Sequence, residues 1–313
     1  MMVFIYIIVI ISASIILVKS THWVIKSLIY LAQYLRISEF VIAFILAGLA
    51  TSFPELFVGI SAAAAKTPIL SLGNVLGANI ANLTLTLGLT IILIRGLGSG
   101  TKTIQRNILY TSILLIYPIL LTLDGQLSRI DGAALLILFI LYNLILFYQS
   151  QDFTKKLANV RRKDLIKNLI MFVIGITLLL ISAKIIVKYS GNLASELTIP
   201  LFLIGLFLVS IGTTLPELAF GIRAAKEQHK DMILGNILGS LTVNSTAVLG
   251  VVALISPIII KNTYLFVSSA IFLVIAYFIF ALFARSKEKI SWQEGFILCF
   301  FYIAFIIIQL LVK

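Results

Sequence analysis

Two glutamates, Glu55 and Glu217, lie inside long apolar stretches, and each directly follows a proline. Burying such a charge in apolar surroundings costs from about 2.5 kcal/mol to far more. Their numbers differ by 162, and the segments around them match: Thr51-Ser52-Phe53-Pro54-Glu55-Leu56 and Thr213-Thr214-Leu215-Pro216-Glu217-Leu218. A lone buried glutamate is open to a structural interpretation, as a protonated partner in an interhelical hydrogen bond. Two in the same repeated motif favour a functional one.

Oxygen-bearing groups surround both glutamates. Thr51 and Ser52 precede the first motif's proline by two or three residues, and Thr213 and Thr214 take the same places in the second. A proline within a helix removes one backbone N–H and displaces the carbonyl one turn earlier. We therefore expect hydroxyl and free carbonyl oxygens beside each carboxylate. A kink held by hydroxyl back-bonding is the alternative, but it leaves the glutamates unexplained.

The next apolar stretch of each motif carries asparagines at matching positions. Asn82 and Asn244 lie deep in these stretches, in step with the glutamates, and we expect them to supply carbonyl oxygens. Asn74 and Asn236 also match, and for them helix capping or interhelical contact is as good an interpretation as ligation. Glycines beside these asparagines allow close helix approach: Gly73, Gly77, Gly235 and Gly239.

Together these groups predict a site for a hard cation. Calcium accepts six to eight oxygen ligands in flexible geometry, whereas magnesium requires a tighter octahedron and keeps its waters. The motifs contain no cysteine or histidine, which argues against zinc, copper or iron. The ion would be cargo, and no resident cofactor is expected.

The composition shows which elements position these residues. Of 313 residues, 61% are apolar and 12% charged, and the only cysteine is Cys299. This excludes soluble, disordered and disulfide-rich classes. The apolar runs are continuous and do not alternate, which disfavours a β-barrel. We predict an all-α polytopic membrane protein.

Ten apolar runs are long enough to cross a bilayer. The first five are Val3–Leu35, Phe40–Ala65, Ile69–Ile94, Ile108–Leu123 and Ala133–Tyr148. The second five are Leu169–Val187, Leu201–Ala225, Met232–Ile258, Leu265–Phe283 and Trp292–Val312. We divide the chain into a half at 1–150 with its motifs at 40–94, a linker at 151–168, and a half at 169–313 with its motifs at 201–258. Because each half has five spans, the repeats have inverted topology.

Positive charge orients the chain. The linker is strongly basic, with Lys155, Lys156, Arg161, Arg162, Lys163 and Lys167. By the positive-inside rule it is cytoplasmic, which places both termini outside a multi-pass protein of the cell membrane. The linker has no aromatic residues suited to stacking on bases, so the formal charge of +12 does not indicate nucleic-acid binding.

Other functions fit less well. An intramembrane enzyme would need a Ser/His pair, a His-Glu-x-x-His motif or an aspartate dyad within the spans, and none is present. Asp124 and Asp131 fall in a predicted outside loop, where we expect them to be solvated. A cation channel usually forms its filter from several subunits. A duplicated chain can close its own site, so we expect a monomer.

The two motifs, each followed by Gly-Asn-x-x-Gly and a deeper asparagine, resemble the alpha-repeats of the sodium/calcium exchanger family, of prokaryotic type, within the cation/calcium antiporter superfamily. The resemblance implies ten spans, alternating access and exchange of Ca²⁺ for Na⁺. It implies a site at Glu55, Glu217, Asn82 and Asn244. It further implies oxygen ligands, mainly for sodium, from Thr51, Ser52, Thr213, Thr214 and Ser240.

Three positions depart from the family pattern. Ala78 stands where the other repeat has Ser240, so one sodium site is weakened or lost. Asn244 stands where many prokaryotic relatives have aspartate, which leaves two certain negative charges. Ala50 replaces the glycine that the second repeat has at Gly212. Exchange of Ca²⁺ for protons, or for another cation, is therefore the main alternative.

Overall fold

The computed structural model describes residues 2–34, 49, 51–98, 102–149, 162–226, 230–286 and 289–311. Within these ranges nine apolar helical segments are long enough to cross a membrane. A tenth, shorter apolar helix, α3 (Phe53–Ala64), occupies the second predicted span. Residues 40–48 and Ala50 of that span lie outside the described residues. The fold is therefore the predicted all-α polytopic membrane fold.

Six of the spans are single helices. They are α1 (Met2–Tyr34), α6 (Lys102–Leu121), α7 (Arg129–Gln149), α8 (Arg162–Leu197), α14 (Thr263–Ser286) and α15 (Trp292–Leu311). A short 3₁₀ turn, η3 (Thr122–Asp124), follows α6. Many large apolar side chains of these helices are exposed, as expected for surfaces that face lipid.

The other three long spans are interrupted by π-helical turns. The third consists of α4 (Pro68–Ala81), η2 (Asn82–Thr86) and α5 (Leu87–Leu93). The eighth consists of α12 (Lys230–Val243), η5 (Asn244–Val248) and α13 (Leu249–Ile255). The seventh consists of α9 (Leu201–Leu203), η4 (Ile204–Val209), α10 (Ser210–Thr213) and α11 (Leu215–Lys226). The interrupted spans are the buried ones, with 61% to 83% of their apolar windows inside the protein.

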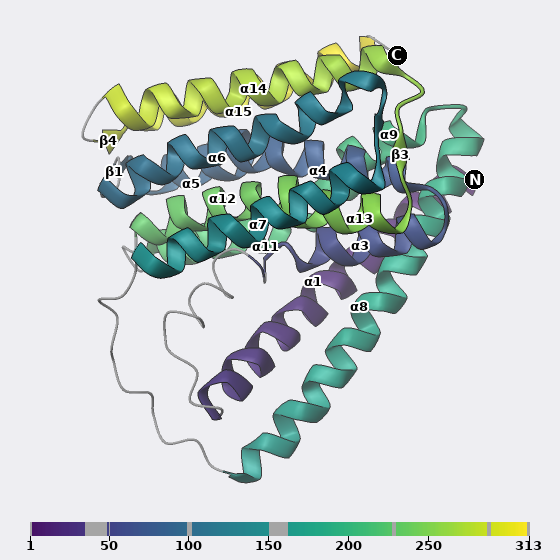
Figure 1. Cartoon of the computed structure of the whole chain (residues 1–313), viewed down its shortest axis with the longest axis horizontal. Coiled ribbons are helices and arrows are strands. Elements are labelled where there is room, and N and C mark those ends of the chain that lie inside the picture. The colour runs from purple at the N-terminus through teal and green to yellow at the C-terminus, as the bar shows by residue number, and fades with distance from the viewer. Residues whose placement is uncertain are drawn as a thin grey trace.

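Two short antiparallel strand pairs show that the halves are inverted. β1 (Leu97–Gly98) pairs with β4 (Lys289–Ile290), and β2 (Gln126–Leu127) pairs with β3 (Ile258–Ile259). To within one residue, the sequence offset that relates Glu55 to Glu217 also relates β1 to β3 and β2 to β4, so each pair is the counterpart of the other. In Figure 1, β1 and β4 lie at one end of the helices, and β3 lies at the other end with the two termini. The repeats thus point in opposite directions.

Backbone contacts join the halves where glycines allow them. A Cβ atom added at Gly73 of α4 would lie 2.2 Å from the carbonyl oxygen of Phe202, and one at Gly77 would lie 2.0 Å from that of Leu206. Among the described residues, an added Cβ at Gly235 meets nothing within 4 Å. The prediction of close approach is confirmed at the two first-half glycines. At the offset of 162, the equivalent contacts of the second half would fall on residues 40–44, which lie outside the described residues.

The buried side chains form two hydrophobic clusters. The larger draws on α4 to α7 and α12 to α15, and the smaller on α1, α8, α3 and the start of the seventh span. Figure 1 shows α1 and α8 side by side, running obliquely past the other helices. Tyr6 and Tyr189 also pack against each other, with ring centroids 5.8 Å apart. The pair of helices forms a layer of its own.

Two predictions need correction. Helix α8 begins at Arg162, so Arg162, Lys163 and Lys167 are helical, although we placed them in the linker; residues 151–161 lie outside the described residues. Asp131 is not simply solvated, because its carboxylate accepts hydrogen bonds from the backbone and hydroxyl of Ser128 and caps α7. Glu294 and Ser291 repeat this capping at α15.

Candidate cation-binding site

The four residues predicted to form the centre of the site are fully buried. Glu55, Glu217, Asn82 and Asn244 are all 0% exposed. They belong to α3, α11, η2 and η5, two elements from each repeat. Helix α3 of the first repeat contacts η5 of the second, and α11 contacts η2. The fold therefore brings together groups from opposite halves of the sequence.

A helix break precedes each glutamate. Helix α3 begins at Phe53, after a turn at Thr51 and Ser52, and α11 begins at Leu215, just beyond the end of α10. Each glutamate therefore lies in the first turn of a new helix, followed by the rest of a span. The partial positive charge of a helix N-terminus stabilises an anionic side chain there. The predicted helix interruption thus also favours the carboxylate.

Two equivalent hydrogen bonds cross between the repeats. Thr51 Oγ1 donates to Asn236 Oδ1 at 3.2 Å, and Thr213 Oγ1 donates to Asn74 Oδ1 at 3.1 Å. These asparagines are therefore interhelical partners and not helix caps. Both bonds hold a motif of one repeat against the neighbouring span of the other, so the pseudo-two-fold axis passes through the site.

Two of the π-helical turns begin at the predicted amide ligands. Helix η2 begins at Asn82 and η5 at Asn244, with the same offset as between the two glutamates. A π-turn widens the helix and is frequent at functional sites. It changes the direction in which the residues at its start point. The sequence holds no proline or glycine at these turns that could have predicted them.

Buried polar atoms without a hydrogen-bond partner concentrate at this site. They include both carboxylate oxygens of Glu55, Oε2 of Glu217, the side-chain oxygens of Asn82 and Asn244, and Oγ of Ser52. Buried polar groups in proteins are nearly always hydrogen-bonded. A cluster of unpartnered acceptor oxygens, two of its side chains carboxylates, suits a hard cation. Such a cation would compensate for their burial.

The hydroxyl groups differ between the two repeats. Ser240 Oγ donates to Glu217 Oε1 at 3.2 Å and lies 3.0 Å from Thr51 Oγ1. Ala78 provides no hydroxyl at the equivalent place, and neither oxygen of Glu55 has a partner. Thr214 bonds back to the Ser210 carbonyl at 2.9 Å. All the predicted oxygen-bearing residues are thus buried near the motifs, but among the described hydrogen bonds only that of Ser240 reaches a carboxylate oxygen of the site.

The sequence analysis did not predict one contact at the site. Asn79, on α4 before η2, accepts a hydrogen bond from Asn244 Nδ2 at 3.1 Å. Its place nearly one helical turn before Asn82 could have indicated that it lies on the same side of the span.

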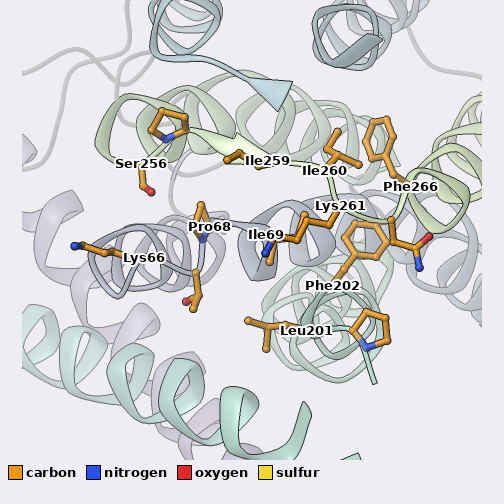
Figure 2. Close-up of a pocket in the computed structure, with 14 residues that line it drawn as sticks. Lys66, Pro68, Ile69, Leu201, Phe202, Ser256, Ile259, Ile260, Lys261 and Phe266 are labelled. Atoms are coloured by element: carbon orange, nitrogen blue, oxygen red, sulfur yellow. The ribbon is translucent and has the colours of Figure 1, made fainter. Parts of the chain in front are cut away.

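A hollow of about 510 Å³ lies away from these residues, at the end of the protein that carries β3. Figure 2 shows its apolar lining, which includes Ile69, Phe202 and Phe266, and two lysines, Lys66 and Lys261. None of the predicted site residues lines it. Apolar walls and ammonium groups do not suit a cation, so the enclosed cluster remains the candidate site.

Comparison with known proteins gives the family. The profile of the sodium/calcium exchanger protein family matches residues 5–148 and 167–311, one segment in each half. The chain belongs to the sodium/calcium exchanger family. Its fold is also similar to solved structures of the sodium-calcium exchanger NCX_Mj. One of them, soaked with Na⁺ and Ca²⁺, has a TM-score of 0.66 and 30% identity and covers 98% of both chains.

Two relatives are similar along most of their length. An uncharacterized membrane protein of Methanocaldococcus jannaschii is 30% identical over 290 residues, which is 93% of both chains. The sodium/calcium exchanger MaX1 of Methanosarcina acetivorans is 27% identical, over 93% of this chain and 95% of its own. The family resemblance inferred from the motifs is confirmed, and it makes the chain a multi-pass membrane protein of an antiporter family.

Proposed function

We propose that this protein exchanges Ca²⁺ for Na⁺ across the cell membrane, by alternating access at the site of Glu55, Glu217, Asn82 and Asn244. The observation that carries the proposal is the cluster of buried acceptor oxygens without partners. Two carboxylates balance the charge of one Ca²⁺, so calcium binding offsets most of the cost of burying them. The ions are substrates, and the proposal needs no resident cofactor.

Exchange follows when the two ions use the same ligands. A bound Ca²⁺ engages both carboxylates, and sodium ions engage the same carboxylates together with hydroxyl or backbone oxygens of Thr51, Ser52, Thr213, Thr214 and Ser240. Because neither ion can bind fully while the other is present, loading one displaces the other. The structures of NCX_Mj soaked with Na⁺ together with Ca²⁺ or Sr²⁺ support this choice of ions.

Helices α1 and α8 are the elements we expect to move. They pack mainly on each other, and their cluster is separate from the larger one that holds α4 and α12. Ser14 of α1 lies against Gly212, just before the second helix break. Sliding of this pair past the other helices would open the site to one side of the membrane and then to the other.

The orientation follows from charge. At the end that carries β1 and β4, Arg95, Lys226, Arg285 and Lys289 are exposed, and α8 begins after the basic linker. We assign this end to the cytoplasm. The end that carries β3 and both termini is then extracellular.

Proton coupling is the second candidate. Ala78 gives Glu55 no hydroxyl partner, so a sodium ion at this place has one ligand fewer, while the free carboxylate can take a proton. The chain would then exchange Ca²⁺ for H⁺ with the same fold and site.

Calcium uptake into proteoliposomes tests both candidates. We would load vesicles with sodium, with acid or with neither, and measure uptake of radioactive calcium by the wild type, Glu55→Gln and Glu217→Gln. Each substitution removes one charge from the site with little change in shape, so we expect uptake to fall to the level of protein-free vesicles. Glu196→Gln changes an exposed glutamate of α8 and should transport like the wild type.

Uptake driven by sodium and lost in both site variants supports the proposal. Uptake driven only by protons moves the assignment to Ca²⁺/H⁺ exchange. If no gradient drives calcium uptake, or if either site variant transports normally, the calcium site is wrongly assigned.

A further inference from the structure

Asn79 and Ser245 depart from the symmetry of the two repeats. The positions equivalent to them in the other repeat are Leu241 and Leu83. All four side chains are at most 2% exposed. Leucine therefore fills the same buried place in the other repeat, and packing alone does not require a polar group. The two polar residues come from opposite repeats, yet they are in contact.

These residues form a hydrogen-bonded chain that ends at the cation site. Asn79 Nδ2 donates to Ser245 Oγ at 2.9 Å. Asn244 Nδ2 donates to Asn79 Oδ1 at 3.1 Å. Both ends of the Asn79 amide are thus engaged within the protein. Asn79 is not a ligand itself, but it holds a residue that we expect to be one.

The hydrogen bond to Asn79 gives the Asn244 side chain a defined orientation that the Asn82 side chain lacks. With its nitrogen engaged by Asn79, Asn244 has an unpartnered oxygen and is 0% exposed. Neither polar atom of Asn82 has a partner. A hydrogen bond donated by an amide nitrogen also polarises the amide and makes its oxygen a better acceptor. The two amides, equivalent in sequence, are therefore unequal in structure.

We propose that Asn79 is a positioning residue for calcium binding, which presents the Asn244 oxygen to the ion and leaves Asn82 free to adapt. The inference rests on the proposed function, because it assumes that this site holds calcium. It assigns calcium affinity in part to a residue outside the repeated motif. The hydrogen-bond partners of metal ligands commonly contribute about 10-fold to 100-fold in metal affinity.

The test compares Asn79→Leu with the wild type in two measurements, calcium binding to purified protein in detergent and calcium-dependent uptake. Leucine is the residue at the equivalent position of the second repeat, Leu241. We expect the half-saturating calcium concentration to rise about 10-fold in both, while the maximal uptake rate changes less than about 3-fold. Thr111→Val removes a hydroxyl that is 0% exposed, outside the site, and should leave calcium binding unchanged.

Repeating the Asn79 substitution in protein that already carries Asn244→Ala shows whether Asn79 acts through Asn244. In Asn244→Ala protein, the further change Asn79→Leu should shift calcium binding by less than about 2-fold, because the residue that it positions is gone. Ser245→Ala should weaken binding less than Asn79→Leu does. Thermal unfolding of each variant identifies any that does not fold. If Asn79→Leu does not fold, Asn79→Ser, which keeps a small polar group, is measured in its place.

Unchanged calcium binding in the Asn79 variant overturns the proposal. So does an equal effect with and without Asn244, which would indicate a general packing role. If the wild type binds calcium but shows no sodium-driven uptake, the exchange function is wrong while the role of Asn79 is still decided by binding. If the wild type binds no calcium, the proposed function and this inference fall together.

Discussion

Ser240 and Ala78 occupy equivalent positions, and they make the two glutamates chemically different. Ser240 donates a hydrogen bond to Glu217 and so fixes one of its oxygens, whereas both oxygens of Glu55 are without a partner. A hydroxyl oxygen can also bind sodium. We therefore expect the two carboxylates to contribute unequally, with the sodium ligands more complete on the Glu217 side.

Exchanging these two residue types tests this asymmetry. Ala78→Ser adds a hydroxyl near Glu55 and should lower the half-saturating sodium concentration of exchange several-fold. Ser240→Ala removes a hydroxyl bonded to Glu217 and should raise the half-saturating sodium concentration. The measurement is calcium uptake at a series of internal sodium concentrations. Ala276→Ser adds a hydroxyl at an equally buried alanine of α14 and should change nothing; an equal shift in this control would contradict the assignment.

At the scale of helices, two glycines set how closely the repeats approach each other. Gly73 and Gly77 let α4 touch the backbone of the seventh span, where added Cβ atoms would lie 2.2 and 2.0 Å from carbonyl oxygens. A carbonyl of a packed helix cannot move aside as a flexible side chain can. A side chain at either position would therefore push the two spans apart.

An alanine variant tests this contact. Gly73→Ala forces α4 away from the start of the seventh span, and we expect it to destabilise the protein by about 1 to 3 kcal/mol. Thermal unfolding in detergent measures the change. Unchanged stability of this variant would contradict the close backbone contact.

At the scale of the whole molecule, the strand pairs β1–β4 and β2–β3 tie together loops from opposite halves. Each pair joins loops separated by an even number of spans, so both partners lie on one side of the membrane. Because the pairs are counterparts in inverted repeats, they lie on opposite sides. This arrangement, together with the basic residues near β1 and β4, supports the orientation that we propose.

Cysteine labelling checks this orientation. In a protein with Cys299→Ala, a single cysteine replacing Lys261, next to β3, should react with a membrane-impermeant maleimide in intact cells. A single cysteine replacing Lys289, in β4, should react only after the cells are opened. Both positions are exposed, so access alone decides the outcome. The reverse pattern would invert the assigned orientation, and labelling of both from outside would contradict the strand topology.

The class of protein, the approximate layout of the spans and the repeat could all be predicted from the sequence. Continuous apolar runs must satisfy their backbone polar groups internally, so they indicate helices directly. The repeated Pro-Glu motifs identified the halves, because apolar composition does not generate coincident prolines, glutamates, glycines and asparagines by chance. These features are local or periodic, and a linear pattern contains them completely.

Which of these residues are in contact became evident only from the folded arrangement of the spans. Asn74 and Asn236 proved to be partners across the repeats, and Asn79 proved to hold Asn244, because such contacts depend on how two distant spans face each other. The π-turns at Asn82 and Asn244 and the start of α8 at Arg162 were likewise not evident from the sequence. Contacts between spans depend on three-dimensional neighbours, which sequence spacing does not encode.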